Sequence, residues 1–374
     1  MNARYEIGSF FEKEDLIESF FGGEAKESFY DWLIDKGDYH FFESGRSAIS
    51  AVISDIEKKT DNKVCLIPAY TCDTVVIPFS LKGWEVYFYQ LNENLEPMED
   101  ELLELIREHN PSVIFTILYY GNDSIEKLRS FLKKWEEDEK HFCIEDLTQA
   151  IFYLEELKSG KALKMKYQTA SLRKWLPVSD GGMSTLYVEP EYTKKDEPKY
   201  SEPQNKAQEL KKRYLLGENV SKEELLSYHR IAESALDERY EILPIDPVSY
   251  QALRLIDWKK IYHKRHENAV FLKGRLDAFS EIDLFIDFDE AAAPLYVPII
   301  VENREAIQGF MSERGVFLPV LWPVPEEVGE NLSPFLKRVY ENMLAIPCDH
   351  RYSIEDMEHI VRLFEEFYSE GLDV

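Results

Sequence analysis

The first half of the chain alternates short apolar runs with longer stretches of helical periodicity. Four runs are rich in β-branched or aromatic residues and bounded by polar residues, which predicts strands over 64–68, 84–89, 112–118 and 141–144. Residues 99–107 and 124–139 place their apolar side chains on one helical stripe. Asp123 and Glu126 predict a capping box at the start of the second helix. This alternation predicts a mostly parallel sheet covered by helices on both faces.

The pattern changes after Tyr187. Residues 190–212 are polar and contain prolines, which predicts a surface excursion. Further along, helices are expected over 221–235, 250–279 and about 353–369, and strands over 295–301 and 316–321. The last helix opens with a Ser353/Asp356 capping box. We therefore expect an N-terminal segment (1–35), a large domain (36–250) and a small α+β C-terminal domain (251–374).

The charge balance limits the class of partner. The 374 residues include 44 basic and 71 acidic side chains, a formal net charge of -27. This disfavours nucleic acid or an anionic membrane as the main partner, because both attract basic surfaces. A small anionic ligand needs only a local pocket and is not excluded. Apolar runs such as 113–120 are far shorter than the roughly 18 residues of a membrane span. The N-terminus lacks a signal-peptide core, so we expect a cytoplasmic location.

The cysteines do not predict a metal site or a disulfide framework. Cys65, Cys72, Cys143 and Cys348 are scattered, with no C-x-x-C pair among them. Both kinds of site need closer and repeated spacing.

Ser44-Gly45-Arg46, where a helix is expected to begin, is a candidate anion-binding site. Glycine lets the backbone approach a ligand closely. The free N–H groups and the positive end of the helix dipole attract phosphate. An ordinary helix cap is the alternative.

A second polar segment, 145–149 (EDLTQ), follows the expected strand 141–144. Open α/β sheets bind ligands at the carboxyl ends of their parallel strands. An acid at this position can hold a pyridine nitrogen protonated, and Gln149 can reach a ring oxygen. A solvated loop is the alternative.

Lys174 lies in the segment SLRKW, shortly before Asp180-Gly181-Gly182. Apolar and aromatic neighbours disfavour the ammonium form and so favour the neutral amine that attacks an aldehyde. A surface lysine is the alternative. Three other lysines lie in a polar run and are expected in solvent: Lys161, Lys164 and Lys166.

The segment 68–72 (PAYTC) also follows a strand, and its aromatic and apolar groups can pack on a flat ring. The alternative is a plain strand-to-helix turn, because 73–81 is expected to be helical with Gly83 as its C-cap.

Together, the order and spacing of these segments resemble the fold-type I enzymes that use pyridoxal 5′-phosphate (PLP). Among these, the chain resembles the DegT/DnrJ/EryC1/StrS aminotransferases. SGRSAI is similar to the SGTxAL turn of that family, IPAYTCDT to its P-x-x-T-aromatic segment and EDLTQA to its E-D-x-x-Q-A motif. ILYYGN is similar to its strand that ends in an aromatic-glycine turn, and the lysine followed by two glycines to its Schiff-base region. The resemblance covers about residues 40–190 and is looser after 250.

The resemblance implies a fold-type I PLP-transferase fold, a PLP cofactor and a homodimer. It implies that Lys174 forms the Schiff base and shuttles a proton, and that Asp146 pairs with the pyridinium nitrogen. It assigns Gln149 to the ring hydroxyl. The phosphate is assigned to Gly45 and Arg46 through backbone amides and to Ser171 through its hydroxyl.

The chain departs from the family at three places. Cys72 stands where the family usually has an aromatic residue, so Tyr70 is the nearest substitute for stacking on the ring. Ser171 lies three residues before the lysine, whereas the sugar aminotransferases often place this serine five before, where Thr169 stands here. The asparagine-arginine segment with which a neighbouring subunit completes those sites is not found.

The expected activity is transfer of an amino group from a donor such as glutamate to a keto acceptor, with a nucleotide-linked ketosugar as one candidate. The alternatives are lyase, dehydratase or decarboxylase chemistry, which PLP serves equally, and a non-catalytic PLP-binding relative. A nicotinamide-dependent enzyme is disfavoured because no G-x-G-x-x-G follows the early strands.

Arg351, in the turn before the last helix, is the candidate clamp for the donor carboxylate. In fold-type I aminotransferases an arginine of the small domain often has this role. A guanidinium suits it because it donates two parallel hydrogen bonds to a planar anion. An ion pair with Asp349 or Glu355 is the alternative.

Overall fold

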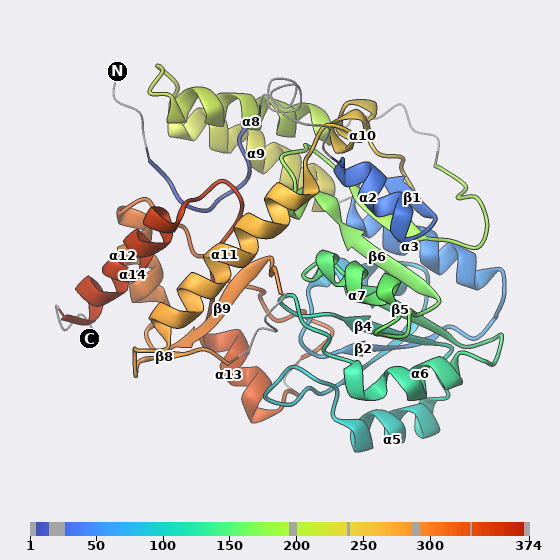
Figure 1. The fold of residues 1–374 in the computed structure, drawn as a ribbon. Helices are drawn as coiled ribbons and strands as arrows, with labels where there is room; N and C mark the ends of the chain where they lie inside the picture. The colour runs from blue at the N-terminus through green and yellow to red at the C-terminus, as the bar shows by residue number, and fades with distance from the viewer. Residues whose placement is uncertain are drawn as a thin grey trace.

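A computed structural model describes residues 5–14, 27–193, 200–237, 240–285, 292–329 and 331–369. Figure 1 shows a large domain on the right, a smaller one on the left, and the long helix α11 (Trp258–Leu276) running diagonally between them. Apolar residues at one end of α11 belong to the first hydrophobic core and those at the other end to the second. Helix α11 therefore packs in the cores of both domains and connects them.

A seven-stranded sheet forms the centre of the large domain, in the order β1-β7-β6-β5-β4-β2-β3. In that order the strands are Tyr39–Phe42, Gly182–Thr185, Tyr167–Ser171, Phe142–Asp146, Val113–Ile117, Val64–Pro68 and Glu85–Tyr89. Neighbours from β6 to β3 pair in parallel, while β7 is antiparallel to both β1 and β6. Strands β4, β5 and β6 are buried along their whole length, as expected of a sheet covered on both faces.

Nine helices of the described residues surround this sheet or lie beside it. They are α2 (Phe29–Lys36), α3 (Gly45–Glu57), α4 (Asp73–Leu81), α5 (Glu99–His109), α6 (Arg129–Trp135), α7 (Leu154–Ser159), α8 (Ser201–Leu215), α9 (Lys222–Asp237) and α10 (Pro247–Leu253). Helix α3 packs against β1, β6 and β7. Helices α8 and α9 form a hairpin at the top of Figure 1, next to the small domain.

The small domain is built on a three-stranded antiparallel sheet in the order β10-β9-β8. Its strands are β8 (Ile282–Asp283), β9 (Tyr296–Val301) and β10 (Met343–Pro347), and its helices are α12 (Arg304–Glu313), α13 (Pro334–Asn342) and α14 (Ile354–Ser369). The Ser353/Asp356 box is confirmed, because Asp356 accepts a 2.7 Å hydrogen bond from the N–H of Ser353 at the start of α14.

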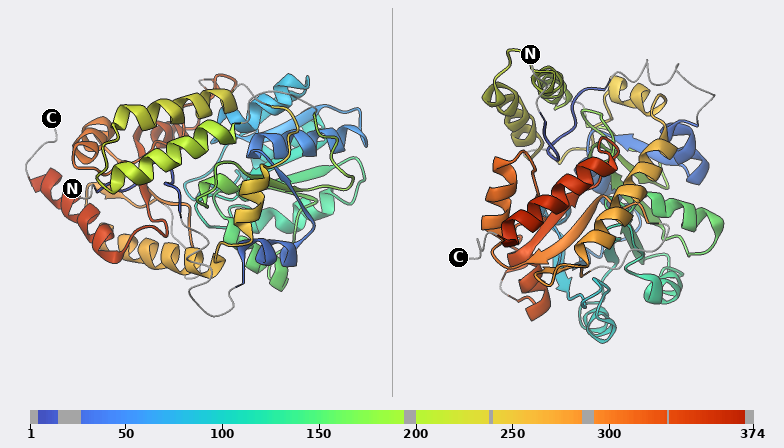
Figure 2. Two further views of the ribbon diagram at one scale, coloured as in Figure 1. Left: turned by 90° about the horizontal axis from the view of Figure 1, so that it is seen from above. Right: turned by 60° about the vertical axis from the view of Figure 1, so that its left-hand side comes forward.

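Residues 5–14 lie between the small domain and the α8–α9 hairpin (Figure 2). Ile7 is buried in the core of the small domain and exchanges backbone hydrogen bonds with Gly315 and Phe317. The N–H of Lys13 donates to the carbonyl of Gln208 in α8. Helix α2, by contrast, packs in the core of the large domain. The expected division at residues 35 and 250 stays a prediction, but the two described parts of 1–35 lie in different cores.

Several expected elements are confirmed. Strands β2, β3, β4 and β5 agree with the expected runs to within about two residues, and α4, α5, α9, β9 and α14 lie where helices and a strand were expected.

Four expectations are wrong in detail. Residues 124–139 are not one capped helix: the carboxylate of Asp123 pairs with Arg129 and accepts from Tyr153, and a 3-10 turn, η1 (Glu126–Leu128), precedes α6. Residues 190–212 include most of α8, with Ala207 and Leu210 buried. The expected helix 250–279 is divided between α10 and α11, since Asp257 caps α11. The expected strand 316–321 has a single bridge, from Val316 to Ile7.

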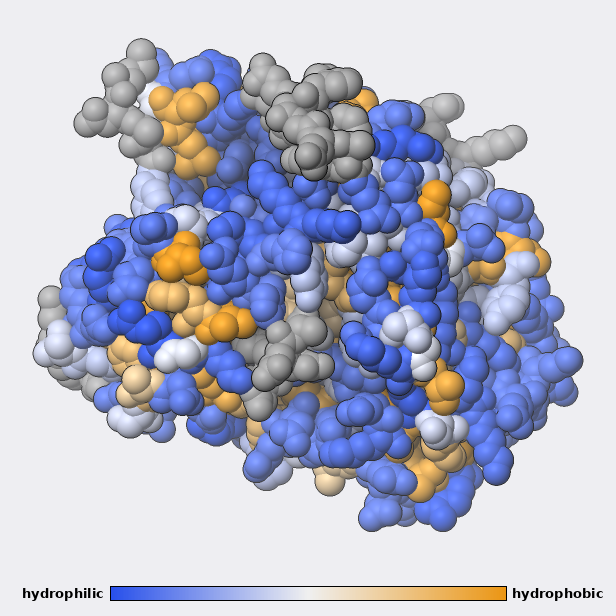
Figure 3. All heavy atoms as spheres, viewed as in Figure 1, coloured by the Kyte–Doolittle hydropathy of each residue, from blue (hydrophilic) through white to orange (hydrophobic). Residues whose placement is uncertain are grey.

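The face seen in Figure 3 is mostly hydrophilic, with small separate hydrophobic patches. Within the described ranges, no helix is both long and apolar enough to cross a membrane.

Candidate active site

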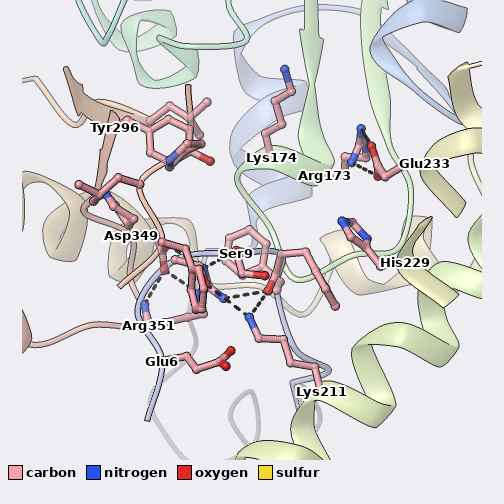
Figure 4. A pocket seen from close by; sticks show the side chains of 18 of the residues that line it. Glu6, Ser9, Arg173, Lys174, Lys211, His229, Glu233, Tyr296, Asp349 and Arg351 are labelled. Carbon is pink, nitrogen blue, oxygen red and sulfur yellow. Dashed lines mark hydrogen bonds and ion pairs between the residues drawn. The ribbon is translucent and has the colours of Figure 1, made fainter. Parts of the chain in front are cut away.

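Two neighbouring cavities lie at the carboxyl edge of the sheet. The inner cavity, of ≈ 70 Å³, is bounded by the ends of β4, β5 and β6 and by the start of α3. The outer cavity, of ≈ 920 Å³, lies between the large domain, the α8–α9 hairpin, residues 8–11 and the small domain (Figure 4). Gln149, Arg173, Lys174 and Trp322 line both. The inner cavity brings together seven residues singled out in the sequence: Gly45, Arg46, Cys72, Asp146, Gln149, Ser171 and Lys174.

The start of α3 packs tightly against the ends of β6 and β7. Ser44 caps the helix by accepting a hydrogen bond from the N–H of Ser47 at 3.2 Å. A Cβ atom at Gly45 would lie 3.3 Å from the Cβ of Ser171, and one at Gly182 would overlap with the carbonyl of Ser44. Glycines at both positions therefore let a helix N-terminus approach the Ser171 hydroxyl, an arrangement suited to an anion.

Asp146 is the last residue of β5 and is only 7% exposed. Burial raises the pKa of this carboxyl, while hydrogen bonds from Thr148 and the charge of Lys174 oppose the rise. One carboxylate oxygen accepts the N–H of Thr148 at 2.8 Å, and the Thr148 hydroxyl accepts the N–H of Ser171 at 3.0 Å. These bonds fix the acid relative to the end of β6.

Gln149 presents an unsatisfied donor. Its Oε1 accepts the N–H of Tyr120 at 3.2 Å, whereas its Nε2 is buried without a hydrogen-bond partner in the described part of the chain. Because buried polar groups are nearly always paired, an unpaired amide on a cavity wall indicates a ligand acceptor there.

Lys174 ends the 3-10 turn η3 (Leu172–Lys174), directly after β6. Burial is the main cause that lowers the pKa of its ammonium group. The charges of Arg173 and Arg46 act in the same direction, and those of Cys72 and Asp146 oppose it. The turn is held by the indole N–H of Trp175, which donates to the carbonyl of Thr148 at 2.8 Å. A fixed lysine with a lowered pKa is suited to act as a nucleophile.

The three comparison lysines lie elsewhere. Lys161, Lys164 and Lys166 line neither the inner nor the outer cavity. Lys161 pairs with Glu156 at 2.8 Å, and Lys166 donates to the carbonyl of His141 at 2.8 Å.

No protein-family model matches the sequence, and a search of curated proteins also gives no match. Solved structures do match over nearly the whole chain. PseC of Helicobacter pylori, an aminotransferase involved in the biosynthesis of pseudoaminic acid, has a TM-score of 0.66 at 13% identity, over 98% of this chain and 100% of that one. The sugar aminotransferase CalS13 of Micromonospora echinospora has a TM-score of 0.62 at 14% identity, over 96% and 93%. A DegT DnrJ EryC1 StrS aminotransferase from Brucella abortus has a TM-score of 0.61 at 13% identity, over 96% and 91%.

The chain has the fold of fold-type I aminotransferases. The expected fold class is thereby confirmed: a large domain with a mostly parallel sheet and a small domain with a separate sheet. At these identities the likeness shows the fold alone, so the chemistry has to be argued from the two cavities.

Tyr70 does not belong to either cavity of this aminotransferase fold. It is fully buried, and its ring packs against Tyr119, Trp322 and Tyr340. Cys72 does line the inner cavity, with its thiol 2.7 Å from the Thr74 hydroxyl. Trp322 is the aromatic residue that lines both cavities. Sequence reasoning missed it because it lies in an irregular segment far from the motifs.

Arg351 lines the outer cavity, but its five N–H groups are all engaged by protein acceptors. It donates to both carboxylate oxygens of Asp349 at 2.8 and 2.9 Å, to Glu12, and to the carbonyls of Ser9 and Phe10. The structure therefore agrees with the alternative interpretation of Arg351, in which it forms an ion pair with Asp349. The donor-carboxylate clamp stays a prediction, but here Arg351 has no free N–H for it.

Proposed function

We propose that this chain is a PLP-dependent aminotransferase in which Lys174 holds the cofactor. The supporting observation is the convergence of Lys174, Asp146 and the unpaired amide of Gln149 with the N-terminus of α3 in one cavity. A binding protein without turnover would need the anion site but not a half-buried lysine of lowered pKa in the same cavity.

The residues of the inner cavity fit PLP group by group. The N–H groups at Gly45 and Arg46 and the hydroxyl of Ser171 would hold the phosphate. The unpaired Nε2 of Gln149 would donate to the ring hydroxyl.

Asp146 would hold a proton on the pyridine nitrogen. Burial raises its pKa, but an adjacent cation favours the carboxylate form. When bound, PLP supplies an electron sink for the carbon that bears the amino group.

Lys174 would move the proton in the transfer step. Its lowered pKa favours the neutral amine, which is the form that can act as a base. A proton taken from the Cα of the donor would then pass to the C4′ carbon of the cofactor, because amino transfer requires this movement between the two carbons.

For the substrates, we propose an amino-acid donor such as glutamate and a keto acceptor of the sugar class, with a nucleotide-linked ketosugar as the candidate. The outer cavity offers neutral amides and hydroxyls that suit a hydroxyl-rich ligand: Ser9, Ser179, Gln204, Gln208, Gln308 and Ser312. Its charged lining contains six basic residues against four acidic ones in a chain of net charge -27. An anionic group on the acceptor is favoured there. A cytoplasmic homodimer is proposed as the working state.

The test is the absorbance spectrum of the purified chain with PLP, before and after glutamate is added. We expect visible absorbance of lysine-bound PLP to convert to the spectrum of pyridoxamine phosphate, with release of 2-oxoglutarate. Release of carbon dioxide or ammonia from amino-acid substrates without this conversion would favour the lyase or decarboxylase alternative. No spectral change on PLP addition would reject the proposal.

A further inference from the structure

Arg173 lies directly before Lys174 and lines both cavities. Its guanidinium faces Glu233 of α9, with Nη1–Oε1 at 3.0 Å and Nη2–Oε2 at 3.3 Å. Figure 4 shows this pair beside Lys174, with His229 just below it. The segment SLRKW does not predict a role for Arg173, because its partner Glu233 lies 60 residues away in the chain.

Arg173 differs from the two other arginines that line the outer cavity. All five N–H groups of Arg351 are engaged, as described above. Arg265 also has an Nε without a partner in the described residues, but it is only 1% exposed: its Nη1 donates to the carbonyl of Leu295 at 2.9 Å, and its guanidinium lies over the ring of Trp175. The Arg173 side chain is 21% exposed, and its two bonds to Glu233 leave three of its five N–H groups without a partner in the described part of the chain.

The present partner of Arg173 is a carboxylate that can be displaced. Its bonds of 3.0 and 3.3 Å are longer than the 2.8 and 2.9 Å that join Arg351 to Asp349. The Glu233 side chain is 33% exposed. Burial alone would raise the pKa of Glu233, but Arg173, His229 and a hydrogen bond from Tyr200 lower it overall. Glu233 is thus ionised at neutral pH. A ligand carboxylate that took its place would also bring one negative charge to the positively charged guanidinium of Arg173.

We propose that Arg173 binds a carboxylate of the amino donor, and that Glu233 is the resident competitor that sets the affinity for it. The position suits this role, because the α-carboxylate and the reacting nitrogen of an amino acid are attached to the same carbon. A carboxylate site must therefore lie close to Lys174, and Arg173 is its neighbour in the chain. The identity of the ligand as an amino donor rests on the proposed function, whereas carboxylate binding itself does not.

The test is calorimetric titration of the full chain, in the presence of PLP, with glutarate as the probe. Glutarate has two carboxylates and no amino group, so its binding requires no turnover. Glu233→Gln should tighten glutarate binding by about 3- to 10-fold, since it removes the competing charge of a partly exposed ion pair. Arg173→Gln should weaken it by about 10-fold or more. The affinity for inorganic phosphate, titrated in parallel, should not change in the same way in these two variants.

Glu223→Gln is the matched control. Glu223 lies in the first turn of α9, outside both cavities, and forms an ion pair with Arg230. It should leave glutarate affinity unchanged if the effect belongs to Arg173, whereas a general loosening of α9 would alter both variants equally.

Equal glutarate binding in wild type, Arg173→Gln and Glu233→Gln would overturn the inference, as would no binding in any of them. So would tightening in Glu223→Gln, or Arg173-dependent binding of phosphate alone. The proposed function is separable from these outcomes. If glutarate binds as expected but glutamate leaves the PLP spectrum unchanged, the aminotransferase proposal fails and the carboxylate site stands. If glutamate converts the spectrum but glutarate affinity is the same in Arg173→Gln as in wild type, only the proposal of a carboxylate site at Arg173 fails.

Discussion

At the scale of single residues, burial and partners separate functional side chains from structural ones of the same type. Lys174 is half-buried and lines the inner cavity with an acid and an unpaired amide, whereas Lys161 and Lys166 pair with protein acceptors outside the cavities. Asp146 lines the inner cavity, whereas its neighbour Glu145 is turned to Arg129 at 2.7 Å. Adjacent residues in a strand point to opposite faces, so the sequence EDLTQ alone predicts that only one of the two acids faces the ligand.

Asp146→Asn tests the acid directly. The amide keeps the shape of the side chain but cannot carry the negative charge that holds a proton on the pyridine nitrogen. We expect amino transfer from glutamate to slow by about 10²–10³-fold in single-turnover absorbance measurements, comparable to the loss of a buried electrostatic partner. Far-ultraviolet circular dichroism should be unchanged. Near-normal transfer in a folded variant would contradict the assignment of Asp146.

Arg351→Ala distinguishes a structural arginine from a substrate clamp. Removal of this side chain leaves Asp349 as a buried charge without its guanidinium and frees the backbone of residues 9 and 10. We expect a loss of about 3–5 kcal/mol in the free energy of unfolding, measured by urea denaturation. The affinity of the folded variant for glutamate should change little. If the variant were stable but bound glutamate much more weakly, Arg351 would be supported as the residue that binds the donor carboxylate.

At the scale of elements, the strands and helices that could be predicted are those whose own residues show a clear pattern of apolar positions. Strands β2 to β5 are such apolar runs. Strand β6 (YQTAS) was missed because it is polar yet fully buried. Its Gln168 is satisfied by Glu145 at 2.7 Å and by Tyr39 at 2.7 Å, and Ser171 by Thr148. Such pairing is long-range, and periodicity cannot detect it.

The contact of β7 with the start of α3 gives a prediction at this scale. In Gly182→Ala the new methyl group would collide with the Ser44 carbonyl and push β7 away from the anion site. Overpacking of this kind costs about 1–3 kcal/mol, so PLP affinity, measured by titration of the visible absorbance, should fall by about 10-fold or more.

Gly274→Ala is the control for this change. It lies within α11 with no atom within 4 Å of its new Cβ. PLP affinity should not change, and stability should rise slightly, by about 0.5–1 kcal/mol. Normal PLP binding by Gly182→Ala would show that the packing of β7 does not shape the site.

At the scale of the whole molecule, the inner cavity was largely predictable and the outer one was not. Seven inner-cavity residues come from motifs before residue 190, each next to a strand end or a helix start. The outer cavity is assembled from residues 8–11, the α8–α9 hairpin and the small domain, which are hundreds of residues apart. Trp322 and Glu233 therefore could not be assigned from the sequence.

The most direct test of the central claim is to locate the cofactor on the chain. Borohydride reduction of the PLP-loaded protein, followed by proteolysis and mass spectrometry, fixes the pyridoxyl group to the lysine that holds it. We expect the label on the peptide that contains Lys174, and no label at this position when Lys174→Ala is treated in the same way. Stoichiometric label on Lys161, Lys164 or Lys166, or on Lys211 in the lining of the outer cavity, instead of Lys174 would contradict the proposed active site.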